Sequence, residues 1–196
     1  MKMRSGTIIT IITAILAASI QSVTTAQRPN QGQLLANAQL SEKQTNQLKS
    51  LGVNIAIPSY IPPGFQVASV LIKPCPSGVR RFCPDYAIIY RNSNNSCFAI
   101  NSTGGGVGDL PPVDLEQKYP VNNPILGKSV VLKYPKSRVP SGLTLIGSWM
   151  GKGPFYRFTG AGSRLVIGTA VTELSNCSDI SPQEAVRVSE SLRYLP

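Results

Sequence analysis

The stretch Tyr86-Ala-Ile-Ile-Tyr-Arg-Asn-Ser-Asn-Asn-Ser-Cys-Phe-Ala-Ile100 decides the fold of this 196-residue chain. Residues 86–91 and 97–100 are rich in aromatic and β-branched side chains, which favour strands. Between them, Asn92-Ser-Asn-Asn95 has the composition of a turn, because short polar side chains hydrogen-bond to nearby backbone. The stretch therefore predicts a β-hairpin.

Further strands are expected on both sides of this hairpin. Residues 65–73 precede it and alternate between two sets of side chains, as a strand does. Residues 103–127 are rich in glycine and proline and should form a long loop, with room for one edge strand. After the loop, the pattern predicts strands at 129–134, 143–150, 155–159 and 164–171, the last three joined as a meander through turns at 151–153 and 160–163.

A short helix is expected before these strands. It should cover residues 41–51, because Ser41 and Gln44 have the spacing of a capping box and Gly52 stands where a helix can end. Residues 55–65 contain three prolines and should be extended.

A second helix is expected at the end of the chain. Ser181 suits the capping position, Pro182 the first helical position and Glu184 the third. The apolar residues at helical spacing, which should pack on the sheet, are Ala185, Val188, Leu192 and Leu195. Together the elements predict an α+β fold: an antiparallel sheet of about six to eight strands, with a short N-terminal helix and a C-terminal helix packed on it.

The N-terminus has the pattern of a cleavable signal peptide. Lys2 and Arg4 precede an uncharged apolar run over residues 7–20, which is shorter than the roughly 20 residues of a spanning helix. Thr24-Thr25-Ala26 supplies small residues for cleavage, so residues 1–26 should be removed; an uncleaved anchor helix is the alternative. We expect a flexible segment over residues 27–40, a single domain over 41–196, and a periplasmic or extracellular location.

The four cysteines all lie in the mature chain, where an even number indicates disulfides. Three pairings are possible. Cys75–Cys83 is favoured, because the residues between them resemble a loop, and this leaves Cys97–Cys177 as a long-range bond. A zinc site is disfavoured, because these spacings do not match a known ligand pattern.

Composition limits the function further. The signal peptide carries two of the 19 basic residues and none of the nine acidic ones, so the mature net charge is +8. Such a charge favours anionic partners, although scattered lysines and arginines also serve solubility. The chain contains no histidine, which removes the commonest general base and metal ligand. We expect no cofactor, no metal and no specific nucleic acid.

Several short motifs resemble nucleotide-binding or catalytic patterns. Gly127-Lys128-Ser129 lacks the spacing of a phosphate loop and precedes a strand pattern, and the glycines at 104–108 fit a loop better than a dinucleotide site. Asp109, Asp114 and Glu116 lie in the long loop, where paired carboxylates would be needed for a hydrolase. Candidate residues for a ligand groove are Trp149, Tyr156, Arg80 and Arg81, although aromatic residues at the strand spacing of Tyr156 and Phe158 are more often core.

Pro58-Ser-Tyr-Ile-Pro-Pro-Gly-Phe65 is similar to the opening motif of a bacterial, cyanobacterial-type family of exported domains of unknown function. The family's tyrosine-rich strand resembles residues 86–90, its tryptophan and tyrosine strands resemble those of Trp149 and Tyr156, and its closing motifs resemble residues 181–184 and 189–192. The resemblance covers residues 54–196; the four cysteines and the N-terminal helix depart from it. It implies a distant similarity to extracytoplasmic anti-sigma domains and to the lipoprotein-carrier fold, and it assigns no catalytic residue.

These observations predict an exported, monomeric and non-catalytic binding domain of the cell envelope. Its partner would be an anionic envelope component or protein, and it would contact the membrane only through its signal peptide during export. One alternative is a carrier of a lipid or other apolar ligand, with a cavity lined by Leu71, Ile88 and Ile146. The other is a hydrolase that uses the carboxylates of Asp114 and Glu116.

Overall fold

The computed structural model describes residues 31–78, 83–103, 117–125, 127–134, 142–146, 154–174 and 176–196. The elements, in chain order, are α1 (Gln31–Ala38), α2 (Glu42–Lys49), β1 (Ala56–Pro58), β2 (Phe65–Lys73), β3 (Asp85–Asn92), β4 (Cys97–Thr103), β5 (Gln117–Asn123), β6 (Gly127–Tyr134), β7 (Gly142–Ile146), β8 (Phe155–Thr159), β9 (Arg164–Ile167), β10 (Ala170–Glu173), α3 (Pro182–Glu190) and β11 (Leu192–Tyr194). The signal-peptide prediction falls on residues outside these ranges.

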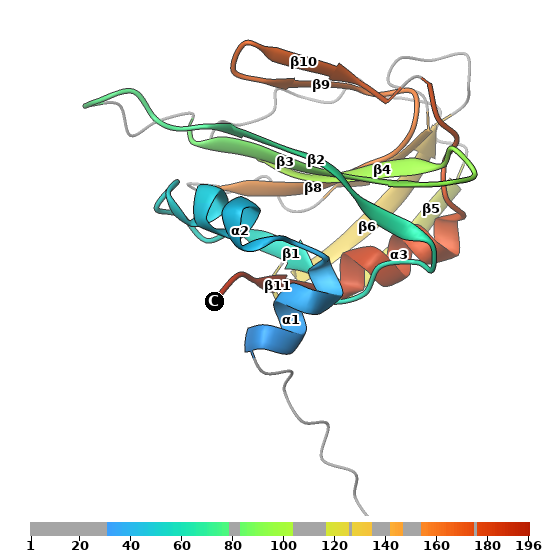
Figure 1. The fold of residues 1–196 in the computed structure, drawn as a ribbon. Helices are drawn as coiled ribbons and strands as arrows, with labels where there is room; N and C mark the ends of the chain where they lie inside the picture. The colour runs from blue at the N-terminus through green and yellow to red at the C-terminus, as the bar shows by residue number, and fades with distance from the viewer. Residues whose placement is uncertain are drawn as a thin grey trace, which may run out of the picture.

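Seven strands form one antiparallel sheet in the order β2-β3-β4-β8-β7-β6-β5 (Figure 1). The remaining strands form two separate pairs, β1 with β11 and β9 with β10. The α+β class predicted from the sequence is therefore confirmed. The long loop expected over 103–127 does contain an edge strand, β5, and its residues 104–116 and 126 are outside the described ranges.

The central hairpin forms as predicted. β3 pairs with β4 from Tyr86 opposite Ser102 to Arg91 opposite Cys97. In the turn, the side-chain oxygen of Asn92 accepts a hydrogen bond from the backbone N–H of Ser96 at 2.8 Å. Asn95 has a φ of 58°, a left-handed conformation that asparagine tolerates better than most residues.

Helices cover one face of the sheet and the β9–β10 hairpin covers the other (Figure 1). We call the face that carries Tyr86, Ile88 and Ile100 the helix face, because these residues share a core with residues of α1, α2 and α3. The opposite face carries Ala87 and Ala99, which pack with Leu165 and Ile167 of the hairpin and with Leu174, and we call it the hairpin face. Alternation along the strands separates the two cores.

The centre of the helix-face core is aromatic. The ring of Phe98 lies 4.9 Å from that of Tyr90 and 5.4 Å from that of Phe158, both stacked, and 5.3 Å from the tilted ring of Phe65. Phe158 is fully buried, as expected for a core aromatic residue at strand spacing. These contacts come from four different strands and hold the middle of the sheet together.

The flexible segment expected over residues 27–40 is corrected for residues 31–40. Residues 31–38 form α1, in which Leu34 and Ala38 are buried in the helix-face core, and Leu40 follows them there. The hydroxyl of Tyr90 donates a hydrogen bond to the backbone oxygen of Ala38. The i, i+4 spacing of Leu34 and Ala38 is the helical pattern in the sequence. The surrounding polar residues made this segment resemble a flexible one.

The helix expected over residues 41–51 is present as α2, which begins at the predicted cap and ends slightly earlier than predicted. The side chain of Ser41 accepts a hydrogen bond from the N–H of Gln44, whose side chain accepts one from the N–H of Ser41, so the capping box is present. α2 ends at Lys49, and Gly52 then adopts a φ of +66°, which glycine allows without strain.

The C-terminal helix is confirmed, but it is shorter than the apolar pattern suggested. Ser181 caps α3, and Ala185 and Val188 are buried. Leu192, expected on the same helical face, instead lies in β11 and pairs with Pro58 of β1. The chain leaves the helix after Glu190 because β1 offers backbone hydrogen-bonding groups that a strand can satisfy.

The strand expected over 164–171 is also corrected. Gly168, with a φ of +63°, reverses the chain there, so that β9 and β10 pair with each other. The predicted meander is therefore wrong beyond β8, which pairs with β4 and β7 and not with β9. Glycine in the left-handed region is what a tight hairpin turn needs.

Both predicted disulfides are present. The Cα atoms of Cys75 and Cys83 are 5.2 Å apart, and those of Cys97 and Cys177 are 5.7 Å apart. The second bond ties the segment before α3 to the start of β4. Two disulfides are compatible with an oxidising environment. No helix within the described ranges has both the length and the apolar composition that crossing a bilayer requires.

Candidate functional site

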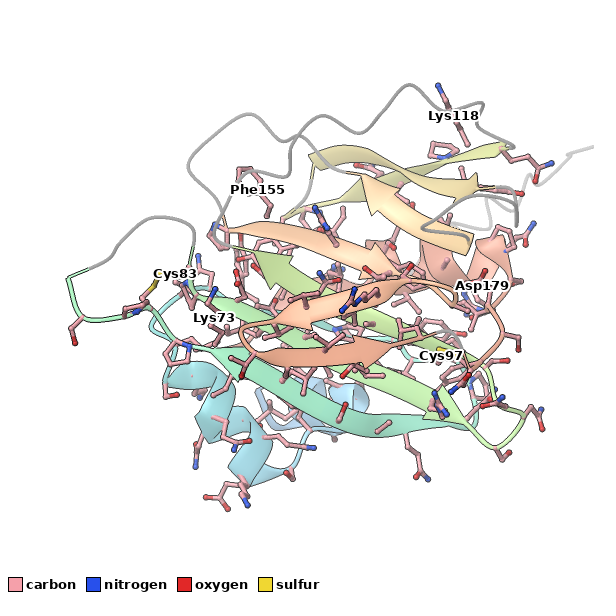
Figure 2. All side chains as sticks on the ribbon, turned by 90° about the horizontal axis from the view of Figure 1, so that it is seen from above. Lys73, Cys83, Cys97, Lys118, Phe155 and Asp179 are labelled. Carbon is pink, nitrogen blue, oxygen red and sulfur yellow. A yellow bond between two sulfur atoms is a disulfide. The ribbon has the colours of Figure 1, made fainter. Side chains whose placement is uncertain are left out.

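One end of the hairpin face is polar. Lys73 of β2 lies opposite Asp85 of β3, and Asn101 of β4 lies opposite Arg157 of β8. Because side chains alternate along strands, these four share one face, and Thr159 joins them from β8. We call these five residues the polar end. Figure 2 shows Lys73 and Phe155 at this end of the sheet, with Cys97 and Asp179 at the opposite end.

An ion pair occupies the side of the polar end next to β2. The Lys73 ammonium lies 3.5 Å from a carboxylate oxygen of Asp85. The lysine side chain is 41% exposed and the aspartate side chain 12% exposed, so the pair is open to solvent on the lysine side. A pair this exposed contributes little to stability. Its position leaves the ammonium accessible to a partner.

On the other side, an amide and a guanidinium lie opposite each other. Asn101 is 5% exposed, and its side-chain oxygen accepts a hydrogen bond from the Thr159 hydroxyl at 2.8 Å. That bond orients the amide, so its nitrogen keeps its donors for another acceptor. Burial lowers the pKa of the Arg157 guanidinium, which nevertheless remains protonated at neutral pH.

The polar end is suited to binding an anionic group. Lys73 and Arg157 are cationic and carry only hydrogen-bond donors, and the Asn101 amide adds N–H donors beside an oxygen that accepts from Thr159. The carboxylate of Asp85 is already paired with Lys73. In the part of the chain that the structure describes, no three histidine, cysteine, aspartate or glutamate side chains gather as metal ligands would.

Of the predicted groove residues, Tyr156 lies within the described ranges, and it does not face the polar end. Tyr156 is buried in the helix-face core, where its hydroxyl donates a 2.7 Å hydrogen bond to the backbone oxygen of Asn54, and burial raises the pKa of that hydroxyl. It therefore lies on the opposite face from Arg157, its neighbour in β8. Trp149, Arg80 and Arg81 lie outside the described residues.

The residues proposed to line a carrier cavity are also on different faces. Leu71 lies opposite Ala87 and packs on the hairpin-face core, whereas Ile88 is buried in the helix-face core. The two cannot line one cavity, because the sheet separates them. The side chain of Ile146 lies outside the description, as do the loop carboxylates of Asp114 and Glu116 and the glycines at 104–108. Gly127, Lys128 and Ser129 all lie in β6, where a phosphate loop would need a helix to follow.

Sequence reasoning did not single out Lys73, Asp85, Asn101 or Arg157. The sequence does contain one indication of a polar site, because Asn101 and Arg157 are polar residues inside otherwise strand-like segments. Their meeting depends on β8 lying next to β4, which local patterns do not reveal.

One buried hydroxyl on the helix face allows a simple test of packing. Ser102 is fully buried, its register neighbours are Tyr86 and Tyr156, and its side-chain oxygen has no hydrogen-bond partner among the described residues. We expect Ser102→Ala to raise the free energy of unfolding by about 1 kcal/mol, because it removes an unsatisfied polar group. Urea denaturation followed by circular dichroism measures this.

Ser189→Ala is the matched control, because the buried Ser189 hydroxyl donates to the backbone oxygen of Ala185 at 2.7 Å. It should not stabilise the protein. A loss of stability in Ser102→Ala would mean that its hydroxyl has a partner in solution.

Comparisons with protein-family models, with curated proteins and with solved structures find no match to this chain. The resemblance described from the sequence therefore stays a prediction, and function has to be argued from the residues themselves.

Proposed function

We propose that this chain is an exported, non-catalytic binding domain of the cell envelope, and that its polar end contacts an anionic envelope component. The observation that carries the proposal is that Lys73, Arg157 and the Asn101 amide lie on one face at the same end of the sheet. The positive charges of Lys73 and Arg157 would attract carboxylate or phosphate groups, and the exposed Lys73 ammonium can donate to their oxygens.

Two further features support this proposal. The mature net charge of +8 attracts anionic surfaces over a distance, and the polar end gives that attraction a place to act. Two disulfides fit a domain that works where thiols are oxidised. Together with the predicted signal peptide, they support a location in the periplasm or outside the cell.

The test is binding of the exported protein to vesicles that contain phosphatidylglycerol, compared with vesicles of phosphatidylcholine alone. Alginate, an acidic polysaccharide, provides a second anionic probe. We expect binding to phosphatidylglycerol at low ionic strength and its loss at about 1 M salt, where the Debye length is roughly 3 Å. Absence of binding to both anionic probes at low salt would contradict the proposal.

Paired substitutions locate the site. Lys73→Gln with Arg157→Gln should weaken binding roughly thirty-fold, because each cation near an anionic surface contributes about 1 kcal/mol. Lys43→Gln with Lys118→Gln removes the same charge from two exposed positions elsewhere, in α2 and β5, and should weaken it much less. Equal losses would mean that overall charge, and not the polar end, determines binding. Circular dichroism of both double variants checks that they are folded.

A further inference from the structure

The two edges of the seven-stranded sheet differ in how well they are protected. β2 forms one edge and β5 the other. An unprotected edge presents backbone N–H and C=O groups to which another strand can add, so proteins usually block edges with prolines, charges or covering groups.

The β5 edge has all three kinds of protection. Pro120 has no N–H to offer, and Lys118 places an exposed charge on the strand. The backbone N–H of Asn122 donates to the Glu190 carboxylate of α3 at 3.2 Å. Addition of a further strand here would have to displace that carboxylate.

The β2 edge has no proline and only one charged residue. It is nine residues long, and its only charge is Lys73 at the end. Ala68 is exposed and falls at a bulge in the pairing with β3, between Val67 and Ser69. The strand is the outermost one on its side of the sheet (Figure 2). Apart from the bulge at Ala68, it therefore offers a long and nearly uncharged template.

A surface groove adjoins the beginning of this edge. It has a volume of about 460 Å³ and is lined by Gln39, Gly64, Phe65, Gln66 and Val67. Gly64 has a φ of +81°, and a Cβ atom placed there would meet nothing within 4 Å. The groove thus leaves room for a side chain of a strand that lies against β2.

We propose that the β2 edge takes an extended, acidic segment of a partner protein as an additional strand. Backbone hydrogen bonds would provide the affinity, and the groove would take one of the side chains. The segment should be acidic because the mature chain carries a net charge of +8 and Lys73 ends the strand; a second copy would bring +8 against +8. This inference rests on the proposed function only in taking an anionic partner.

The probe is a fluorescein-labelled peptide of eight residues that alternates valine and glutamate, added to the exported protein. Its binding is followed by fluorescence anisotropy, and amide hydrogen exchange locates it. We expect exchange in residues 65–73 to slow on binding. A peptide with N-methyl groups on alternate residues keeps the charge and loses the donors, so it should bind at least about tenfold more weakly. A peptide of the same length that alternates valine and lysine should also bind more weakly than the acidic one.

Two substitutions test whether the peptide binds at the β2 edge. Ala68→Glu places a negative charge on the β2 edge and should weaken binding of the acidic peptide about tenfold. Asn122→Glu adds the same charge at the opposite edge, on an exposed position, and should leave binding unchanged.

Besides a failure of the acidic peptide to bind, three results would overturn the inference. The first is equal binding of the N-methylated peptide, and the second is protection from exchange at residues other than 65–73. The third is concentration-dependent dimerisation that Ala68→Glu abolishes, which would assign the edge to a second copy. Vesicle binding that depends on Lys73 and Arg157 while the peptide fails would reject strand addition and leave the proposed function in place. Peptide binding without vesicle or alginate binding would reject the proposed function and leave strand addition in place.

Discussion

Replacing both cysteines of the Cys97–Cys177 bond with alanine should lower the free energy of unfolding by about 4.5 kcal/mol. The bond closes a separation of 80 residues, so its loss restores much conformational freedom to the unfolded chain. Domains of this size are stable by only about 5 to 15 kcal/mol. The double variant should therefore be marginally folded at room temperature.

The surroundings of this bond support a large effect. Cys97 is fully buried at the start of β4, and its N–H donates to the backbone oxygen of Ser178 at 3.0 Å. The N–H of Ser178 in turn donates to the backbone oxygen of Asn95 at 2.9 Å. The turn of the central hairpin and the segment before α3 are thus held together at the same place by covalent and hydrogen bonds.

The matched control is the double alanine variant of Cys75 and Cys83. That bond closes a separation of only eight residues, for which the same estimate gives about 2.5 kcal/mol. Urea denaturation of both variants, analysed at equal protein concentration, measures the difference. A larger loss in the short-loop variant would contradict the view that constraint of the unfolded chain dominates.

Asn123→Asp should be nearly as damaging, although it changes a single atom. Asn123 is 1% exposed, and its amide nitrogen donates to the backbone oxygens of Ser189, Glu190 and Leu192 at 2.9, 2.9 and 3.1 Å. A carboxylate would place negative oxygen against three carbonyl oxygens at the end of α3. We expect a loss of about 4 kcal/mol, as for an uncompensated buried charge.

The pH dependence of this variant separates charge from packing. The buried carboxyl should have a pKa above its unfolded value, so the variant is most stable at low pH and loses stability as the pH rises through the folded pKa. The difference in unfolding free energy from the unsubstituted protein should therefore shrink below about pH 4, near the ordinary aspartate pKa. A loss independent of pH would point to altered packing.

Asn46→Asp, at an exposed position of α2, is the control for the same chemical change at the surface. It should alter the free energy of unfolding by less than about 0.5 kcal/mol. Thermal and urea unfolding at several pH values measure both variants.

Local signals in the sequence were sufficient for the hairpin, the capped helices and the disulfides. The turn at 92–95 and the capping serines act within a few residues, so the chain carries the information in one place. Cys75 and Cys83 are close in sequence and separated by a loop-like segment, so their pairing could be predicted from the short loop that it closes. Once they were paired, only Cys97 and Cys177 remained.

The polar end could not be predicted in the same way. Lys73, Asp85, Asn101 and Arg157 come from four strands, and Arg157 lies beside Asn101 only because β8 pairs with β4. That strand order depends on pairing between segments that are distant in sequence. Each strand could pair with several others, and local patterns do not specify which. The division of 164–171 into two strands depended on the conformation of Gly168, since a glycine in a short apolar run also fits a continuous strand.

The pairing of β1 with β11 has a consequence for the order in which the domain can be completed. Residues 56–58 find their strand partner only in residues 192–194, among the last of the chain. If the chain is threaded through a membrane from its N-terminus, as we propose, β1 has nothing to pair with until almost the whole polypeptide has crossed. On that route, β1 and β11 would pair only on the far side of the membrane, and the chain would cross without this contact.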